Sequence, residues 1–461
     1  MLSISEVKKR IIETSAKQVV KDSIELAKNK SEYHALLAIT EDRAMKLAED
    51  VDNGRISGKL AGIPFIVKDN FLAFGAPTTA ASKILENFYS PLQATAINKL
   101  EAEGAICIGK ANLDAFAHGG STENSAFGPT KNAVDTSRVA GGSSGGSAVS
   151  VALGIVPFAL GSDTGGSIRQ PASFNGVVGI KPTYGTVSRY GVVAMASSTD
   201  VIGLFANDVA DTELIMSIIS GKDVRDMTTL PDFFKVQPDI ESKLNIGLIK
   251  EFMAEGVDPD VKRSVTNYVE KLRANGHLVE EVNLPMVKYA LAIYYIVVPA
   301  EISSNLARYD GVRYGHRSES VKNLTDLYTK SRGEGFVAEN KRRIMIGSYV
   351  LSSGFFDAYY LKAQKARTLL IDQFNNLFSK YDALIGLVSP SPAFKLGENT
   401  TDPIKMYLED VMTVPASLAG LPAISVPAGK SESGLPIGVQ LIGPRKSDAT
   451  LLALAKSMEG K

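Results

Sequence analysis

Serine and glycine are concentrated in two short stretches of this sequence, and these residues are the best placed to do chemistry. The first stretch reads GGSSGGS at 141–147, and the second reads GSDTGGS at 161–167. Glycine costs conformational entropy, so such clusters indicate that backbone closely approaches a ligand, or that N–H groups point at an anion. A pair of tight turns is the structural alternative. Neither stretch has the ending of a phosphate loop or the dinucleotide-binding pattern.

Two shorter motifs within these stretches do not predict a function. Ser144 lies in a G-x-S-x-G pattern, but that nucleophile elbow needs a downstream acid and then a histidine. Only His277 and His316 follow it, and neither lies in a recognisable loop at a strand end. The tripeptide at 163–165 matches that of aspartic proteases, but the second copy that a shared-proton pair of carboxylates requires is missing from the sequence.

Serine chemistry with a lysine base fits the remaining pattern. A serine hydroxyl is a weak nucleophile at neutral pH and needs a base, and this chain has only four histidines. Lys68 follows the apolar run 63–67, which predicts a strand. Its amine could therefore lie in a water-poor site, where the neutral form is favoured. From local context alone, an exposed lysine at a strand end is the simpler interpretation.

The elements that must position these residues indicate an α/β fold, because helical periodicity alternates with short β-branched runs along the chain. A capping box at Ser3 and Glu6 predicts a helix that extends through Val19. Further helices are predicted at 41–54, before Gly104, and near 259–274 and 355–380. Strands are predicted at 63–67, near 106, and at 158–160, 246–249, 423–426 and 437–440. No low-complexity linker divides the sequence, so we expect residues 1–461 to form one domain. This domain would have a helical segment at about 1–55, a core at about 60–205 and a helical insertion at about 255–380.

Composition excludes several classes of protein. The sequence has 50 basic residues (Lys and Arg) and 50 acidic residues (Asp and Glu), so its net charge is zero. The protein therefore has no overall positive charge to attract nucleic acid. The longest nearly apolar stretch, 148–160, is shorter than the roughly 20 residues of a membrane span. We expect a cytoplasmic protein, because the N-terminus shows no apolar signal region. Cys107 lies in an apolar run, so we expect it to be buried like an apolar residue. The four histidines are scattered along the sequence, which argues against a metal site.

The two stretches, with the continuation SIRQPA at 167–172, resemble the amidase signature family. That family has a single α/β domain, whose large mixed central sheet is covered by helices on both faces, and it uses a Ser-cisSer-Lys triad. Ser167 follows Ser143 by 24 residues and Lys68 by 99, which match the family's separations. The resemblance implies that Lys68 is the base, Ser143 the bridging serine after a cis peptide bond, and Ser167 the nucleophile. It also implies an oxyanion hole made by four backbone N–H groups, those of Thr164, Gly165, Gly166 and Ser167.

Over essentially its whole length the chain is similar to one branch of the family, the glutaminase subunits of tRNA-dependent amidotransferases. The runs that carry this similarity are 121–132, 181–185, 308–315 and 341–345. The resemblance implies that Arg343 and Asp410 recognise the α-carboxylate and α-amino group of free glutamine, with Tyr294 lining the site. Because of the neighbours Arg342 and Tyr295, these assignments are open by one residue. Gly120 departs from the branch, in which serine is common at this position.

The same resemblance implies a function and partners. The chain would hydrolyse glutamine to glutamate and ammonia without a cofactor of its own. Ammonia would pass to the amidotransferase's B subunit, which uses ATP and magnesium to convert Glu-tRNA(Gln) to Gln-tRNA(Gln) and binds most of the tRNA, while a small C subunit holds the two together. A stand-alone amidase for aliphatic or aryl amides is an alternative. A non-catalytic assembly protein is another, although the intact triad argues against it.

Overall fold

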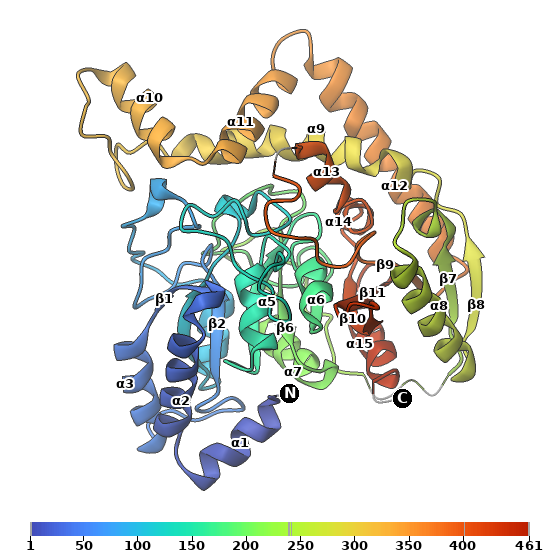
Figure 1. Ribbon diagram of the computed structural model, residues 1–461, viewed down its shortest axis with the longest axis horizontal. Helices are drawn as coiled ribbons and strands as arrows, with labels where there is room; N and C mark the ends of the chain where they lie inside the picture. Colours follow the sequence, from blue (N-terminus) through green and yellow to red (C-terminus); the bar gives the residue numbers. More distant parts are fainter. Residues whose placement is uncertain (1, 238–239, 241, 401, 460–461) are drawn as a thin grey trace.

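The computed structural model describes residues 2–237, 240, 242–400 and 402–459, and Figure 1 shows its ribbon. Within this part of the chain, one 11-stranded sheet has the order β1-β3-β2-β4-β6-β5-β10-β11-β9-β7-β8. Strand β2 runs parallel to β3 and β4, and β7 runs parallel to β8 and β9. The remaining pairs are antiparallel. The predicted α/β fold with a large mixed sheet is therefore confirmed.

The helices and strands have the following bounds. The strands are β1 (Leu36–Ile39), β2 (Pro64–Lys68), β3 (Ile106–Ala111), β4 (Phe158–Asp163), β5 (Val178–Lys181), β6 (Val201–Ala206), β7 (Asn245–Ile249), β8 (Leu278–Val282), β9 (Ala383–Leu387), β10 (Ala423–Lys430) and β11 (Pro436–Ile442). The α-helices are α1 (Ile4–Glu13), α2 (Ala16–Asn29), α3 (Glu41–Asp52), α4 (Thr95–Ala102), α5 (Gly145–Ala152), α6 (Arg169–Asn175), α7 (Val209–Ile219), α8 (Pro259–Ala274), α9 (Val287–Asn305), α10 (Leu324–Gly335), α11 (Ala338–Val350), α12 (Lys362–Phe378), α13 (Pro403–Leu408), α14 (Val414–Leu418) and α15 (Asp448–Ser457).

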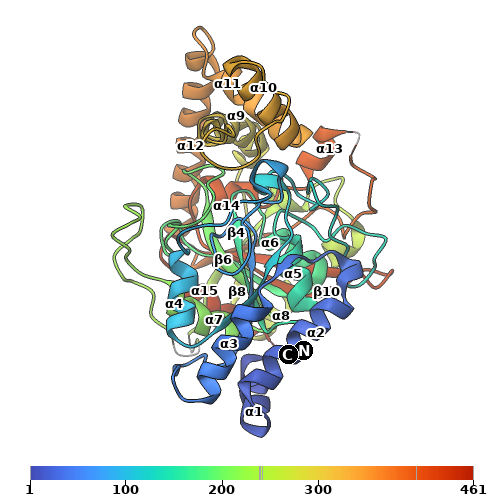
Figure 2. The same cartoon turned by 90° about the vertical axis from the view of Figure 1, so that its left-hand side faces the viewer.

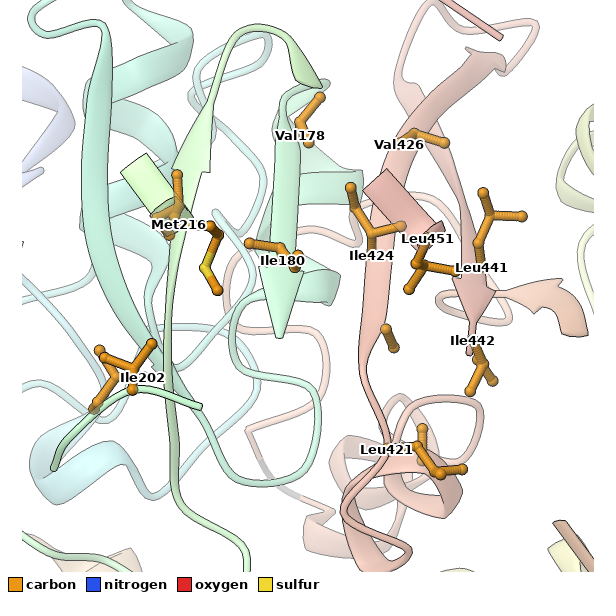
Figure 3. Packing of buried hydrophobic residues seen from close by; sticks show 14 of the residues in the cluster. Val178, Ile180, Ile202, Met216, Leu421, Ile424, Val426, Leu441, Ile442 and Leu451 are labelled. Carbon is orange, nitrogen blue, oxygen red and sulfur yellow. The ribbon is translucent and has the colours of Figure 1, made fainter. Parts of the chain in front are cut away.

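The central strands are buried on both faces, as their continuous apolar sequences require. Along β2, Phe65 and Val67 belong to one apolar cluster and Ile66 to the other, because successive side chains point to opposite faces. Helices α4 and α7 cover the first face, and α2 and α5 cover the second, as the side view shows (Figure 2). Figure 3 shows part of the first cluster, where Met216 of α7 and Leu451 of α15 lie beside β5, β10 and β11. Helices thus cover both faces of the sheet, as expected.

Helices α9 to α12 stand together at one end of the molecule (Figure 1). Helix α9 packs against α11, α12 and α14. By length and composition alone, the segment Val287–Arg308 could cross a membrane, but half of its most apolar window is buried inside the fold, as in a core helix. The predicted insertion at 255–380 also includes β8, which pairs with β7 in the sheet, so its first part is integral to the sheet.

The N-terminal helix and the helix near 355 differ from the sequence predictions. The capping box at Ser3 is present, but α1 ends at Glu13, and Ser15 caps a separate helix α2 by accepting from the Gln18 N–H group. The prediction of one helix through Val19 is therefore wrong, because a second N-cap interrupts it. The helix expected from 355 begins as a π-helical segment, Phe356–Leu361, before α12. Cys107 is buried in β3, as expected.

Candidate active site

Lys68 is the last residue of β2 and is completely buried. Its Nζ atom lies 2.7 Å from Ser143 Oγ, 3.0 Å from Ser162 Oγ and 3.3 Å from the Ser162 carbonyl oxygen. Burial lowers the pKa of the Lys68 amine to about 7. Three buried aspartates oppose this shift: Asp114, Asp163 and Asp200. A neutral amine has two N–H groups and one lone pair, so donation to the two Ser162 oxygens leaves the lone pair to accept the Ser143 proton.

Ser143 lies in the first Gly/Ser loop, immediately before α5. The peptide bond between Gly142 and Ser143 is cis, as the resemblance implies. Gly142 donates its N–H to Gln170 Oε1 at 2.9 Å, and Gly141 accepts from Thr122 Oγ1 at 2.7 Å. A Cβ atom on Gly142 would come within 2.2 Å of an Asp114 carboxylate oxygen, so only glycine fits there. Hydrogen bonds and close packing thus hold the loop that presents Ser143.

Ser167 lies between β4 and α6 and is 7% exposed. The Ser144 N–H group donates to the Ser167 carbonyl at 3.2 Å, which holds the two Gly/Ser loops side by side. Among the described residues, however, no hydrogen bond joins the Ser143 and Ser167 hydroxyls. The structure therefore brings Lys68 and Ser143 into contact and places Ser167 on the adjoining loop.

The loop after β4 carries the predicted oxyanion hole. Within the described part of the chain, none of the N–H groups of Thr164, Gly165, Gly166 and Ser167 donates a hydrogen bond to the protein. Tyr294 of α9 lies over this loop, since a Cβ atom on Gly165 would be 2.8 Å from its hydroxyl oxygen. Four backbone donors without partners are suited to a developing negative charge. Their role in the oxyanion hole is a prediction that this geometry allows.

Arg343 of α11 is 3% exposed, and its Nε donates to Glu339 Oε1 at 2.8 Å. Its guanidinium carbon lies 5.3 Å from the ring centroid of Tyr295 and 5.6 Å from that of Tyr407. Aromatic faces and a carboxylate thus fix the cation. Its two terminal nitrogens have no hydrogen-bond partner among the described residues, so they are free for a ligand carboxylate. The neighbouring Arg342 contacts the same Glu339, but its side chain is 44% exposed.

Asp410 follows α13, and its carboxylate has no hydrogen-bond donor among the described residues. Burial raises the pKa of Asp410 to about 7, although the positive charge of Arg343 opposes the shift. A Cβ atom on Gly120 would lie 3.6 Å from both Asp410 Oδ1 and Gln170 Nε2. Burial raises the pKa of the Tyr294 hydroxyl, Arg343 lowers it and Asp410 raises it further, so the three side chains lie near enough to interact.

Several residues of this site were not predicted from the sequence. Ser162 contacts the Lys68 amine, and Asn70 Nδ2 in turn donates to Ser162 Oγ at 3.0 Å. Ser162 lies within the second Gly/Ser stretch, so the sequence did indicate this segment, although not this residue. Glu339 precedes Arg343 by four residues, a spacing at which oppositely charged side chains meet on a helix. Tyr407, which stacks on Tyr295, is distant in the sequence and carries no such signal.

Comparison with known proteins gives consistent results. The family model described as Amidase matches residues 18–452. The A subunit of the glutamyl-tRNA(Gln) amidotransferase of Koribacter versatilis (strain Ellin345) is 52% identical over 436 residues, which cover 93% of this chain and 91% of the relative. The protein of the same name from Carboxydothermus hydrogenoformans is 50% identical, with 99% and 96% of the two chains covered.

Solved structures extend the comparison. The crystal structure of the glutamyl-tRNA(Gln) amidotransferase A subunit from Thermotoga maritima has a TM-score of 0.84 and 41% identity, and the match covers 99% of this chain and 94% of that one. A bacterial aryl acylamidase has a TM-score of 0.86 at 24% identity, which shows a common fold. The sequence signature, the sheet and these matches agree, and the chain belongs to the amidase signature family.

Proposed function

We propose that the chain is the glutaminase subunit of a glutamyl-tRNA(Gln) amidotransferase. The observation that carries the proposal is a cation and an anion, Arg343 and Asp410, whose ligand-facing groups lack protein partners among the described residues. Asp410 and Gln170 both border Gly120, and Gln170 accepts the N–H of the residue before Ser143. Free glutamine carries the complementary carboxylate and ammonium groups. The two relatives named above, at about half identity, are named as A subunits of a glutamyl-tRNA(Gln) amidotransferase, which supports the proposal.

The reaction follows from the protonation states. Neutral Lys68 accepts the Ser143 proton while Ser143 accepts that of Ser167, whose oxygen attacks the carbon of the glutamine side-chain amide. N–H groups of the 164–167 loop stabilise the oxyanion. The C–N bond breaks as the proton returns through Ser143 to the leaving nitrogen, so ammonia departs and a glutamyl ester remains on Ser167. Water then hydrolyses the ester to glutamate and regenerates the hydroxyl.

Ammonia would pass to the partner B subunit, which would use ATP and magnesium to convert Glu-tRNA(Gln) to Gln-tRNA(Gln). A small C subunit would complete the assembly in the cytoplasm. The names of the relatives support a multisubunit enzyme, since each is named as the A subunit of one. The net charge of zero suits a chain that leaves most tRNA binding to a partner.

The experiment that tests this proposal separates ammonia production from transamidation. In the assembled complex, Ser167→Ala should abolish transamidation that depends on glutamine, whereas added ammonium salts should still support it. The measurement is the yield of Gln-tRNA(Gln) with each nitrogen source. Equal loss with both sources would assign Ser167 a structural role and contradict the division of labour within the complex.

A further inference from the structure

A buried carboxamide lies between Gly142, in the loop of Ser143, and Gly120, which borders Asp410. Gln170 is in the first turn of α6 and is 0% exposed. Its Oε1 accepts the Gly142 N–H at 2.9 Å, but its buried Nε2 has no hydrogen-bond partner among the described residues. A buried N–H donor left unpaired costs free energy, so such groups usually have a partner. The side chain therefore indicates an acceptor that arrives with a ligand.

The orientation of this carboxamide is determined by its contact with Gly142. The Gly142 N–H can be accepted only by the oxygen of the side chain, so the NH₂ group must point the other way. That direction leads to the space at Gly120, where a Cβ atom would lie 3.6 Å from Gln170 Nε2 and 3.6 Å from Asp410 Oδ1. Glycine at 120 leaves this space open, and the unused donor and the carboxylate both border it.

The chemistry of glutamine leaves one acceptor for this donor. The α-ammonium group can only donate, and Asp410 is available to receive it. The oxygen of the side-chain amide belongs at the backbone donors of the 164–167 loop. Because the α-carboxylate and α-ammonium are attached to one carbon, a donor beside Asp410 lies within reach of the carboxylate. We propose that Gln170 is a specificity-determining residue, which donates from Nε2 to the α-carboxylate of the substrate.

This proposal rests on the proposed glutaminase function and assigns Gln170 more than a structural role. If Gln170 merely held Gly142, only its oxygen would matter. Gln170→Glu keeps an oxygen facing Gly142 and replaces the NH₂ group by an oxygen at nearly the same volume, so it removes the donor and, when ionised, adds a negative charge that also repels a substrate carboxylate. Gln170→Met removes both the donor and the acceptor. The two variants therefore separate contact with the substrate from support of the loop.

The experiment uses the full chain, co-expressed with its partner subunits. L-glutamine is compared with its α-amide, which keeps the ammonium but replaces the carboxylate by a neutral group. Gln170→Glu should raise KM for glutamine by about 10- to 100-fold, the effect of losing a hydrogen bond to a charged group, and change kcat little. For the α-amide, KM should rise by a clearly smaller factor, because its carbonyl oxygen is a neutral acceptor whose hydrogen bond is weaker than that of a carboxylate. Where turnover of the α-amide is slow, its inhibition constant against glutamine hydrolysis serves the same comparison.

Ser173→Ala is the matched control, because Ser173 lies on the same helix and its Oγ accepts from the Gly438 N–H at 2.8 Å, outside the site. It should leave both substrates unaffected. An unchanged KM for glutamine in Gln170→Glu, with a loss only in Gln170→Met, would show that Gln170 merely supports the loop and would overturn the proposal. Equal losses on glutamine and its α-amide in Gln170→Glu would overturn it as well. Failure of the wild-type complex to hydrolyse glutamine, with activity on propionamide retained, would instead reject the glutaminase function itself.

Discussion

In the proposed mechanism Lys68 is a base, and a lysine can act as a base only while its amine is neutral; this requirement gives a prediction at the scale of one residue. Lys68→Ala should reduce glutamine hydrolysis as much as Ser167→Ala, and the double variant should be little worse, because members of one catalytic unit are not additive. Lys68→Arg should not restore activity, since a guanidinium stays protonated. Single-turnover rates check this, with melting curves to confirm folding. Robust turnover by the arginine variant would contradict the neutral-lysine mechanism.

Arg343 and Asp410 provide a second residue-scale prediction. Truncating one partner of a buried charge pair costs about 2–5 kcal/mol, so Arg343→Ala or Asp410→Ala should lower kcat/KM for glutamine by about 30-fold or more. Propionamide carries neither charge, and its slow hydrolysis should be nearly unaffected. Arg342→Ala is the matched control, because that neighbour contacts the same Glu339 with a side chain that is 44% exposed. Equal losses on both substrates would favour the stand-alone amidase.

At the scale of elements, α6 holds the loop of Ser167 through Arg169. Its guanidinium bonds to Asp163 at 2.9 Å and to the Thr413 carbonyl at 2.8 Å, and both members of the ion pair are fully buried. Arg169→Met would leave the Asp163 charge unpaired, which costs about 3–5 kcal/mol. Urea unfolding should show this loss, together with lower kcat on glutamine and propionamide alike.

The matched control for Arg169 is the exposed pair of Arg273 and Glu270 on α8, whose side chains are 48% and 61% exposed. Arg273→Ala should cost less than about 1 kcal/mol, because water screens such pairs. A similar loss in the two variants would mean that the buried pair contributes nothing particular to the position of α6.

At the scale of the whole molecule, two titrating groups from distant segments determine the pH dependence. Burial lowers the pKa of Lys68 to about 7 and raises that of Asp410 to about 7. In the proposed mechanism both groups work in their deprotonated forms, so both active fractions should rise with pH through 7. Below pH 7, log kcat/KM should rise with a slope approaching two for glutamine and one for propionamide. Asp410→Asn should reduce the glutamine slope to one, and an unchanged slope would exclude Asp410 from this dependence.

Sequence alone predicted the parts of the protein whose signals are local. The strand that ends in Lys68, the helix at 259–274 and the sheet class follow from periodicity and caps, and the structure confirms them. The resemblance to the amidase signature family implied the triad of Lys68, Ser143 and Ser167, and the structure places Lys68 against Ser143. Yet the local pattern at Ser3 predicted one helix where the fold has two, since Ser15 offers a competing cap.

Tertiary structure decided what depends on contacts between distant segments. Arg343 and Arg342 are adjacent in sequence, but only Arg343 is buried beside the stacked rings of Tyr295 and Tyr407, because the packing of α11 on α9 selects one side of the helix. Likewise, the unpaired donor of Gln170 borders Gly120 and Asp410 only because the fold brings helix α6 and two distant segments together. The sequence therefore determined which chemical groups are present. The topology of the chain decided which of them are buried together, and burial is what shifts their pKa values and leaves donors unpaired.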